Sequence, residues 1–399
     1  MKRFTYKAKE QSSGKVIKGT IQAETERVAG KLLVDRGYVP EYIKEEGGGL
    51  ADKMNKVTSK DRINFTRQFA TLVGAGLPIA QSLRSVSEQT QNKSMKAIIE
   101  EILADVEAGR PLSTAFAKHP DTFNKVYLSL IKAGETSGTL DQSLRRIAEQ
   151  EEKDQKMLGK IKSAMTMPLI TLFVIIVVFI YMMLEVVPHV ESLYSDLGEE
   201  LPTLTLIMVG IKDFLINFWW LVIVILGVMV AFFMQWRKTD NGIHVMATIK
   251  LNVPMFNGLF RILYMSRFAR ISQILLSTGV AVLDTMNIAG EATANVVIQE
   301  KVDAAGEKVQ SGRPLSEALK EQEYIDPLVY QMAAIGEQSG KMDEMLGKAA
   351  QVFEDELDEK IATISAMIEP VMMIMLAVVA GLLVGGVLFP IYSLVNSIG

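Results

Sequence analysis

Three long stretches of the chain consist almost entirely of apolar residues and predict membrane-spanning helices. Residues 168–188, 214–235 and 370–395 each supply the roughly 20 apolar residues that are needed to cross about 30 Å of hydrocarbon. The first stretch carries one charge, Glu185 near its far end, and the other two carry none. The apolar run at 201–211 is too short to span, so we expect it to form a helical or interfacial approach to the second span.

The distribution of Lys and Arg predicts the orientation of these spans. Cations precede the first span and follow the second, at Lys153, Lys156, Lys160, Lys162, Arg237 and Lys238. The segment between these spans, 189–213, has Lys212 as its one cation among five acidic residues. We therefore expect this loop outside, the N-terminus in the cytoplasm and, by parity, the C-terminus outside. The polar N-terminal segment has no apolar signal-peptide core, which fits this orientation.

The segments that precede the first and third spans, 58–167 and 236–369, have the pattern of helices. Apolar residues in them recur at three- and four-residue intervals, as on one face of a helix. Thr58 followed by Asp61 resembles a capping box at the start of the first helix. We expect each segment to fold as an antiparallel bundle of about six helices. The last helix of the first bundle is expected to start near Leu140 and to continue into the membrane.

Residues 1–46 have a different pattern and predict a small mixed α/β unit. Two strands, a helix and a third extended piece are expected at residues 4–8, 16–23, 25–36 and 39–44, in that order. Ser12-Ser13-Gly14 would form the turn between the strands, and Gly37 would end the helix. Gly47-Gly48-Gly49, within a flexible linker at 47–57, would tether this unit to the first bundle.

Two halves of the chain repeat one another, which indicates an internal duplication. The segment Gly109-Arg110-Pro111-Leu112-Ser113 (GRPLS) recurs unchanged 203 residues later, at 312–316. The segment Gly134-Glu135-Thr136-Ser137-Gly138 (GETSG) recurs 202 residues later as GEQSG, at 336–340. The predicted fold is therefore mainly α, with two duplicated helical bundles, three transmembrane helices and the small N-terminal α/β unit.

Composition narrows the classes of function. The chain has 399 residues and a net charge of −4, which argues against nucleic acid as a partner. It has no cysteine, which excludes disulfides, thiolate metal sites and cysteine nucleophiles. Its three histidines are far apart in sequence, and no cofactor fingerprint or Ser/His/Asp set is present. We therefore expect no cofactor, no metal site and no enzymatic activity.

Glu135 and Glu337 occupy equivalent glycine-flanked turns. The second turn is followed by Lys341 and superficially resembles a phosphate-binding loop, but only three residues separate its glycines and Met342 follows the lysine. A helix–helix turn whose glutamate caps a neighbouring helix N-terminus fits better. The alternative is that both turns contact a partner, through Glu135, Ser137, Gly138, Glu337, Ser339 and Gly340.

Two acidic residues at the edges of the predicted spans are candidates for function. Glu185 lies near the outer end of the first span, and Glu369 lies at the inner mouth of the third. Ionisable residues in a membrane are usually functional, but both of these are close enough to an interface to reach water, so both interpretations stay open. We expect the acidic run 354–359 to be a solvated helix face.

The motifs together resemble the inner-membrane platform proteins of type IV pili and type II secretion systems. The resemblance covers essentially the whole chain and includes Asn64–Leu72, the GRPLS and GETSG pairs and Arg267–Arg270. The positions that carry it are Arg67, Gln68, Gly76, Pro78, Arg110, Pro111, Arg270, Gly279, Arg313 and Pro314. The second copy departs from the pattern because it has no proline equivalent to Pro78.

The resemblance implies a non-enzymatic platform that couples a separate hexameric cytoplasmic ATPase to the insertion of pilin subunits into a filament. The implied partners are this assembly or retraction ATPase, pilins or pseudopilins, other inner-membrane alignment proteins, membrane lipid and further copies of the chain. Pilus, secretion and competence systems share this platform. A transporter subunit driven by a cytoplasmic ATPase is the alternative, but it would place polar residues along the spans. An intramembrane enzyme would need catalytic residues in the spans. The predicted spans contain few polar residues and no candidate catalytic residues.

Overall fold

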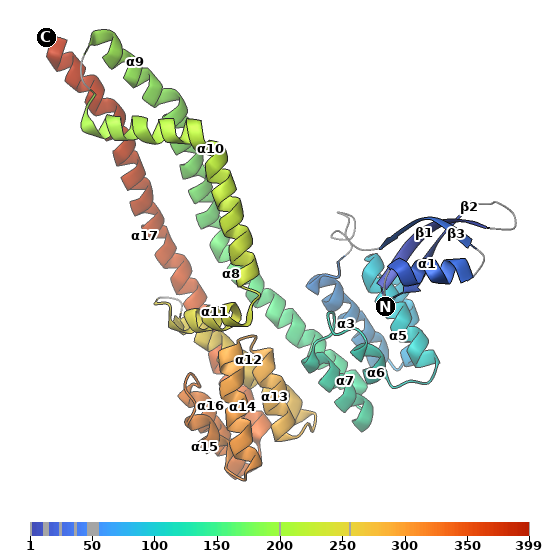
Figure 1. The fold of residues 1–399 in the computed structure, drawn as a ribbon. Helices are drawn as coiled ribbons and strands as arrows, with labels where there is room; N and C mark the ends of the chain where they lie inside the picture. Colours follow the sequence, from blue (N-terminus) through green and yellow to red (C-terminus); the bar gives the residue numbers. More distant parts are fainter. Residues whose placement is uncertain are drawn as a thin grey trace. The chain divides into compact units, whose positions relative to one another are not determined.

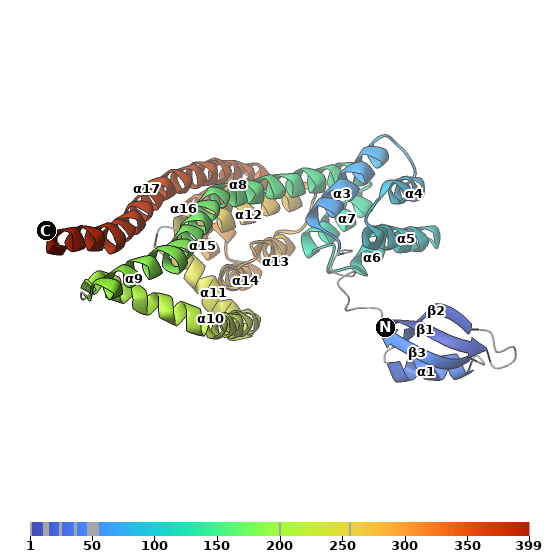
Figure 2. The same cartoon turned by 90° about the horizontal axis from the view of Figure 1, so that it is seen from above.

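The chain divides into two units, Met1–Thr122 and Phe123–Gly399, in the computed structural model (Figure 1; Figure 2). The structure describes residues 2–10, 16–23, 26–35, 38–45, 56–198, 201–254 and 257–398. The predicted turn at Ser12–Gly14, the helix end at Gly37 and the tether at Gly47–Gly49 lie outside these residues. The domain boundaries given above remain predictions.

Three described strands of the first unit form an antiparallel sheet in the order β2-β1-β3. The elements are β1 (Lys2–Glu10), β2 (Val16–Ala23), α1 (Glu26–Asp35) and β3 (Tyr38–Glu45). Helix α1 packs on the sheet, and both Ala8 of β1 and Leu33 of α1 are buried. The mixed α/β fold that the sequence predicts for this segment is confirmed.

Helices follow the sheet in the described part of the first unit. They are α3 (Ser59–Gly74), α4 (Ile79–Gln89), α5 (Lys93–Glu107) and α6 (Leu112–Ala117). The predicted capping box starts α3: the Asp61 carboxylate accepts the Thr58 N–H at 2.9 Å, and the Thr58 hydroxyl oxygen accepts the Asp61 N–H at 3.2 Å. Phe65 stacks on Phe69 with 5.6 Å between ring centroids, and Phe116 lies 6.1 Å from Phe65. These buried rings form a core between α3 and α6.

The second unit consists of helices and short connections in the residues described. Its first part contains α7 (Lys125–Ser137), α8 (Leu140–Tyr181), the π turn η1 (Met182–Val186), α9 (Val187–Leu197), α10 (Thr203–Trp236) and α11 (Asp240–Asn252). Its second part contains α12 (Asn257–Ser277), α13 (Val282–Ala292), α14 (Val296–Gln310), α15 (Leu315–Lys320), α16 (Pro327–Ser339) and α17 (Met342–Ile398). Helix α12 packs along α17, and Phe268 and Phe353 are buried in this bundle. The predicted start of a long helix near Leu140 is confirmed.

The bounds of the helices in the two copies coincide once the sequence offset is applied. Helices α4, α5 and α6 correspond to α13, α14 and α15, with both ends displaced by 203 residues. Helix α7 corresponds to α16 with a displacement of 202 residues. The offset changes because residues 118–124 follow α6, whereas only residues 321–326 follow α15. Glycines with positive φ recur at equivalent positions: Gly76 and Gly279, Gly109 and Gly312, Gly138 and Gly340. The predicted duplication is therefore present in the structure.

Equivalent residues also start equivalent helices. The Asn92 side-chain oxygen accepts the N–H groups two and three residues later, at 3.0 and 3.1 Å, and so caps α5. Asn295 caps α14 in the same way, at 3.0 and 3.2 Å. Pro78 and Ala281 precede α4 and α13 with nearly the same backbone angles, φ −54°, ψ 142° and φ −59°, ψ 147°. The absence of proline from the second copy therefore leaves this turn unchanged.

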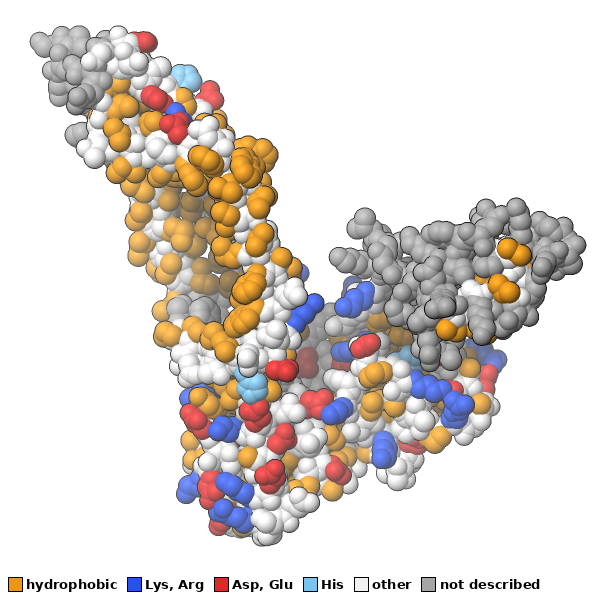
Figure 3. Space-filling model, viewed as in Figure 1, with side chains coloured by type: hydrophobic (Ala, Val, Ile, Leu, Met, Phe, Trp, Pro, Cys, Tyr) orange, Lys and Arg blue, Asp and Glu red, His pale blue; other side chains and the backbone are white. Residues whose placement is uncertain are grey.

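Three helical stretches among the described residues are long and apolar enough to cross a membrane: Leu140–Asp196, Thr205–Trp236 and Met342–Leu382. Hydrophobic side chains cover the arm built from α8, α10 and α17, whereas charged side chains gather over α11–α16 (Figure 3). Large apolar residues on this arm, such as Trp219 and Ile374, are more than half exposed. Because such a surface is favourable in lipid and unfavourable in water, the chain is a multi-pass membrane protein.

The connection between the first two spans contains more helix than the sequence pattern predicts. Val190 and Tyr194 of α9 are buried and pack with Leu201. Their four-residue spacing places both side chains on one face of a helix, where the sequence predicted a loop. Lys212 of α10 is 8% exposed, and its ammonium lies 2.6 Å from the Glu191 carboxylate on α9. This ion pair joins the two helices at the end of the arm.

The approach to the second span is helical, which is one of the two alternatives that the sequence left open. Residues 203–211 belong to α10, which continues through the charged pair Lys212 and Asp213 to Trp236. The backbone leaves the helical conformation at Phe218, with φ −120° and ψ 17°, so the helix bends there.

Candidate functional site

The two repeated motifs of the second copy contact one another. The Glu337 carboxylate accepts hydrogen bonds from the backbone N–H groups of Leu315 and Ser316 and, at 2.5 Å, from the Ser316 hydroxyl. Leu315 and Ser316 belong to the GRPLS motif and begin α15 directly after Pro314. The carboxylate therefore satisfies N–H groups that have no partner within their own helix. The predicted interpretation of this glutamate as a helix cap is confirmed at Glu337.

The first glycine of each GETSG-type turn allows two helices to approach closely. A Cβ atom added to Gly336 would lie 2.7 Å from the Met342 Cα, and one added to Gly134 would lie 2.8 Å from the Ser143 Cβ. Both distances are shorter than real Cβ contacts, so a larger side chain would push α17 from α16 or α8 from α7. The last glycine of each turn has a φ of 74° or 69°, as a left-handed C-cap requires. The sequence predicted these turn glycines but not the close contact at the first one.

The arginine of the first GRPLS motif is held by an acidic residue nearby. The Arg110 guanidinium lies 2.9 Å from the Asp105 carboxylate, which also pairs with Lys118. The hydrogen bond from Lys118 and the nearby positive charges lower the pKa of Asp105. The arginine thus has a local structural role in the first copy.

The second copy contains the same three charges with two of them exchanged. Arg313 lies 2.6 Å from Glu321, which also pairs with Lys308 at 2.7 Å. Hydrogen bonds from Arg313 and then Lys308 lower the pKa of Glu321 to about 2. At the offset of 203 residues, Lys308 stands in the place of Asp105, and Glu321 in the place of Lys118. The acid and the lysine have changed places while the arginine has kept its own.

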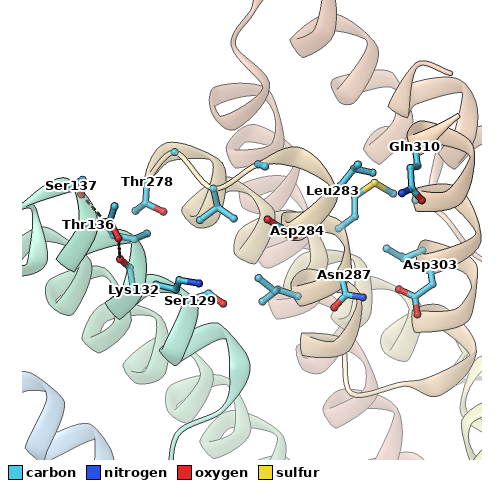
Figure 4. Close-up of a pocket in the computed structure, with 18 of the residues that line it drawn as sticks. Ser129, Lys132, Thr136, Ser137, Thr278, Leu283, Asp284, Asn287, Asp303 and Gln310 are labelled. Atoms are coloured by element: carbon cyan, nitrogen blue, oxygen red, sulfur yellow. Dashed lines mark hydrogen bonds between the residues drawn. The ribbon is translucent and has the colours of Figure 1, made fainter. Parts of the chain in front are cut away.

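A cleft of about 1140 Å³ lies between α7 and the helix pair α13–α14 (Figure 4). Lys132, Thr136 and Ser137 line its α7 side, the last two from the GETSG motif. Asp284 and Asp303 line the opposite side, on α13 and α14. The cleft therefore lies between elements of the two sequence copies, and the predicted contact residue Ser137 stands on its wall.

The α13–α14 wall of this cleft is acidic. Burial, together with the neighbouring Glu291 and Glu307, raises the pKa of Asp303, whereas Lys125 opposes this shift. Outside the cleft lining, Lys125 of α7 lies 2.6 Å from Glu291 of α13 and links these two helices. In the part of the chain that the structure describes, no group of three or more His, Asp or Glu residues is arranged to hold a metal ion.

The remaining predicted contact residues lie elsewhere. The Ser339 hydroxyl donates to the Ile335 carbonyl oxygen at 2.7 Å, as the Ser137 hydroxyl does to Ala133 at 2.8 Å. Ser339 is nevertheless not part of the cleft wall, and neither is Gly340. The structure thus brings only the first-copy turn to the cleft. Arg67 and Gln68 are exposed on α3 of the first unit.

The acidic run 354–359 is solvated only in part: Asp355, Asp358 and Glu359 are exposed, as the sequence predicted, whereas Glu354 is partly buried. The Glu354 carboxylate is 20% exposed, accepts a hydrogen bond from Arg270 at 2.7 Å and lies 3.3 Å from the Lys153 ammonium. Leu357 within the run is buried. The prediction was wrong at Glu354 because α17 packs against both α8 and α12 here, and Lys153 and Arg270 on these helices meet its carboxylate. These partners are about 200 and 84 residues away in sequence.

The two membrane-edge acids lie in distinctive positions. Glu185 is in the π turn η1, and such turns often occur at functional sites. Its backbone carbonyl oxygen lies 2.5 Å from a ring nitrogen of His189. Glu369 is exposed on α17 and lines a groove between α17 and α8. Both interpretations of these carboxylates, functional and solvated, therefore stay open.

The sequence of this chain is similar to those of known proteins. Residues 65–188 and 268–390 both match the family described as "Type II secretion system (T2SS), protein F", and residues 1–44 match its N-terminal domain. Type IV pilus assembly protein PilC of Thermus thermophilus is 37% identical over 99% of this chain and 98% of its own length. The PilC protein of Pseudomonas aeruginosa is 32% identical over 92% and 98% of the two chains. Type II secretion system protein F of Vibrio cholerae is 28% identical over 99% of each. The chain belongs to the family of type II secretion system protein F and type IV pilus assembly protein PilC.

Proposed function

We propose that this protein is the inner-membrane platform of a type IV pilus or a related secretion machine. The observation that carries the proposal is the near-complete coverage of relatives named for these two systems. Two copies of a helical bundle and three lipid-facing helices suit a protein that anchors soluble partners at a membrane. The protein itself is proposed to be non-enzymatic, so the energy for assembly comes from a partner.

In this proposal the N-terminus and both bundles face the cytoplasm, and the C-terminus lies outside. Lys162 precedes the first span, and Arg237 and Lys238 follow the second, as expected for cytoplasmic ends. Helix α9 lies between these spans and carries no Lys or Arg, which suits the outer side.

The cleft between α7 and α13–α14 is the surface that we assign to a cytoplasmic hexameric ATPase. A partner seated there contacts elements of both copies at once. Helix α7 leads through the turn at Gly138 directly into α8, which enters the membrane. Movement of α7 by the ATPase would therefore be passed to a spanning helix, and from there to a pilin or pseudopilin held in the bilayer. Ser137, on the cleft wall, is a proposed contact of this kind. Glu135 is proposed as a further partner contact, although it does not line the cleft. Alignment proteins and further copies of the chain would complete the assembly.

The test is deletion of the gene, followed by complementation. We expect the deleted strain to retain its pilins in the inner membrane and to make no surface filaments or to lose secretion. Complementation with the intact gene should restore filaments or secretion, which electron microscopy and an assay of secreted protein would measure. Filaments and secretion at normal levels in the deleted strain would contradict the proposed function.

A further inference from the structure

A cationic cavity lies where α8, α12 and α17 meet, outside the cleft described above. It has a volume of about 180 Å³. Five cations line it: Lys153, Lys156, Lys160, Arg267 and Arg270. Helix α8 belongs to the first sequence copy and the other two helices to the second, so the cavity joins the copies. A cavity with this surplus of cations is suited to an anion.

The acidic residues of the cavity are already engaged. Glu354 pairs with Arg270 and Lys153, and Asp358 lies 2.6 Å from the Lys160 ammonium. The third acid, Asp154, accepts a hydrogen bond from the Gln150 amide at 3.0 Å. Three carboxylates thus face five cations, which leaves positive charge in excess.

Several donors are left over for an added ligand. The Nε of Arg267 and the Nη2 of Arg270 are buried and have no hydrogen-bond partner among the described residues. Lys156 is exposed at the cavity and has no ion-pair partner among the residues that the structure describes. Buried guanidinium donors without partners are unfavourable, and a phosphate group supplies several oxygen acceptors in the geometry that guanidinium prefers.

An apolar groove lies further along two of these helices, α8 and α17, toward the predicted spans. It has a volume of about 660 Å³, and Met167, Met372, Met373 and Leu376 line much of it. On α8 the groove starts at Ser163, three residues beyond Lys160, which is about 4.5 Å along a helix. The groove then follows both helices into the hydrocarbon region predicted above.

Glu369 is the acidic residue in the groove lining. It is exposed, so its carboxylate can remain at the water-facing edge while apolar chains occupy the floor. We propose that the cavity and the groove together bind one anionic phospholipid, with its phosphate among Lys156, Arg267 and Arg270 and an acyl chain between α8 and α17. The lipid would tie the two copies together at the membrane surface, a role beyond that of the proposed platform.

The experiment uses the purified full-length chain in a nonionic detergent, titrated with phosphatidylglycerol or phosphatidylcholine and followed by native mass spectrometry. We expect one phosphatidylglycerol to bind at least tenfold more tightly than phosphatidylcholine. Lys156→Gln should weaken phosphatidylglycerol about threefold, and addition of Arg267→Gln should weaken it about tenfold or more. Lys348→Gln, on α17 outside the cavity, is the matched control and should bind as the unaltered protein does.

Two further arms separate the lipid from a free phosphate ion. Ala164→Trp fills the groove and should weaken phosphatidylglycerol at least fivefold, while inorganic phosphate at millimolar concentration should not displace the lipid. Equal binding of the two lipids, or unchanged binding in Lys156→Gln, would overturn the proposal. So would displacement by inorganic phosphate combined with normal lipid binding in Ala164→Trp, because the cavity would then be a phosphate site. Lys156 is exposed, so its variant should fold even if Arg267→Gln does not.

Discussion

The Glu337 carboxylate lies 2.5 Å from the Ser316 hydroxyl and holds the start of α15 against the end of α16. Helix α15 has only six residues, too few to be stable without tertiary contacts. The two segments that repeat most clearly in the sequence are therefore the two sides of one contact in the second copy.

Removal of this cap should destabilise the second bundle. We expect Glu337→Ala to lower the free energy of unfolding by about 1–2 kcal/mol, as loss of a helix cap usually does. Thermal unfolding of the full-length chain in detergent would measure the change. Glu323→Ala, which removes an exposed carboxylate between α15 and α16, is the control and should change little. Equal stability of the two variants would show that the cap contributes nothing.

Alanine should have opposite effects at two glycines of the same bundle. Gly336→Ala would force a Cβ to within 2.7 Å of the Met342 backbone and should cost about 1–3 kcal/mol. Gly306→Ala, inside α14, meets no atom within 4 Å and should stabilise the chain by about 0.5–1 kcal/mol through helix propensity. The difference in melting temperature between the two variants tests both statements. A stable Gly336→Ala variant would contradict the close packing of α16 on α17.

The exchanged charges of the two copies predict a rescue. Lys308→Asp should lower the melting temperature because it places a second carboxylate next to Glu321. Adding Glu321→Lys recreates the order found at Asp105 and Lys118, where the arginine pairs with the acid. The double variant should therefore melt close to the unaltered protein. A double variant less stable than either single one would rule out this equivalence.

The absence of cysteine from the chain allows a direct test of orientation. Ser195→Cys, on α9, should react with an impermeant maleimide added to intact spheroplasts. Glu323→Cys, in the second bundle, should react only after the membrane is opened, because we place that bundle in the cytoplasm. The reverse pattern of labelling would invert the proposed topology.

Local sequence patterns were sufficient for much of the fold. The capping box at Thr58 and Asp61 depends on residues three apart, and the apolar spans depend on composition alone, so neither needs knowledge of distant contacts. The repeat offset carries further information beyond the two motifs. Asn92 and Asn295 are 203 residues apart and each caps a helix, so the recurrence of asparagine at this offset is itself a signal for both caps.

Contacts between distant segments could not be predicted in this way. The pairing of Lys153 with Glu354 joins residues 201 apart, and nothing near Glu354 in sequence distinguishes it from a solvated acid. The cleft beside Ser137 was missed for the same reason, because its opposite wall comes from the second copy. No local sequence pattern predicted the π turn at Glu185.

The most direct test of the central proposal is the affinity of the purified chain for the hexameric ATPase of the same system. We expect the intact protein to bind the ATPase measurably and the platform alone to hydrolyse no ATP. The double variant Lys132→Glu/Asp284→Lys reverses a charge on each wall of the cleft and should lose at least tenfold in affinity. Lys348→Glu, on an exposed face of α17 outside the cleft, should leave the affinity unchanged. Undiminished binding by the folded cleft variant, or ATP turnover by the platform itself, would contradict the account.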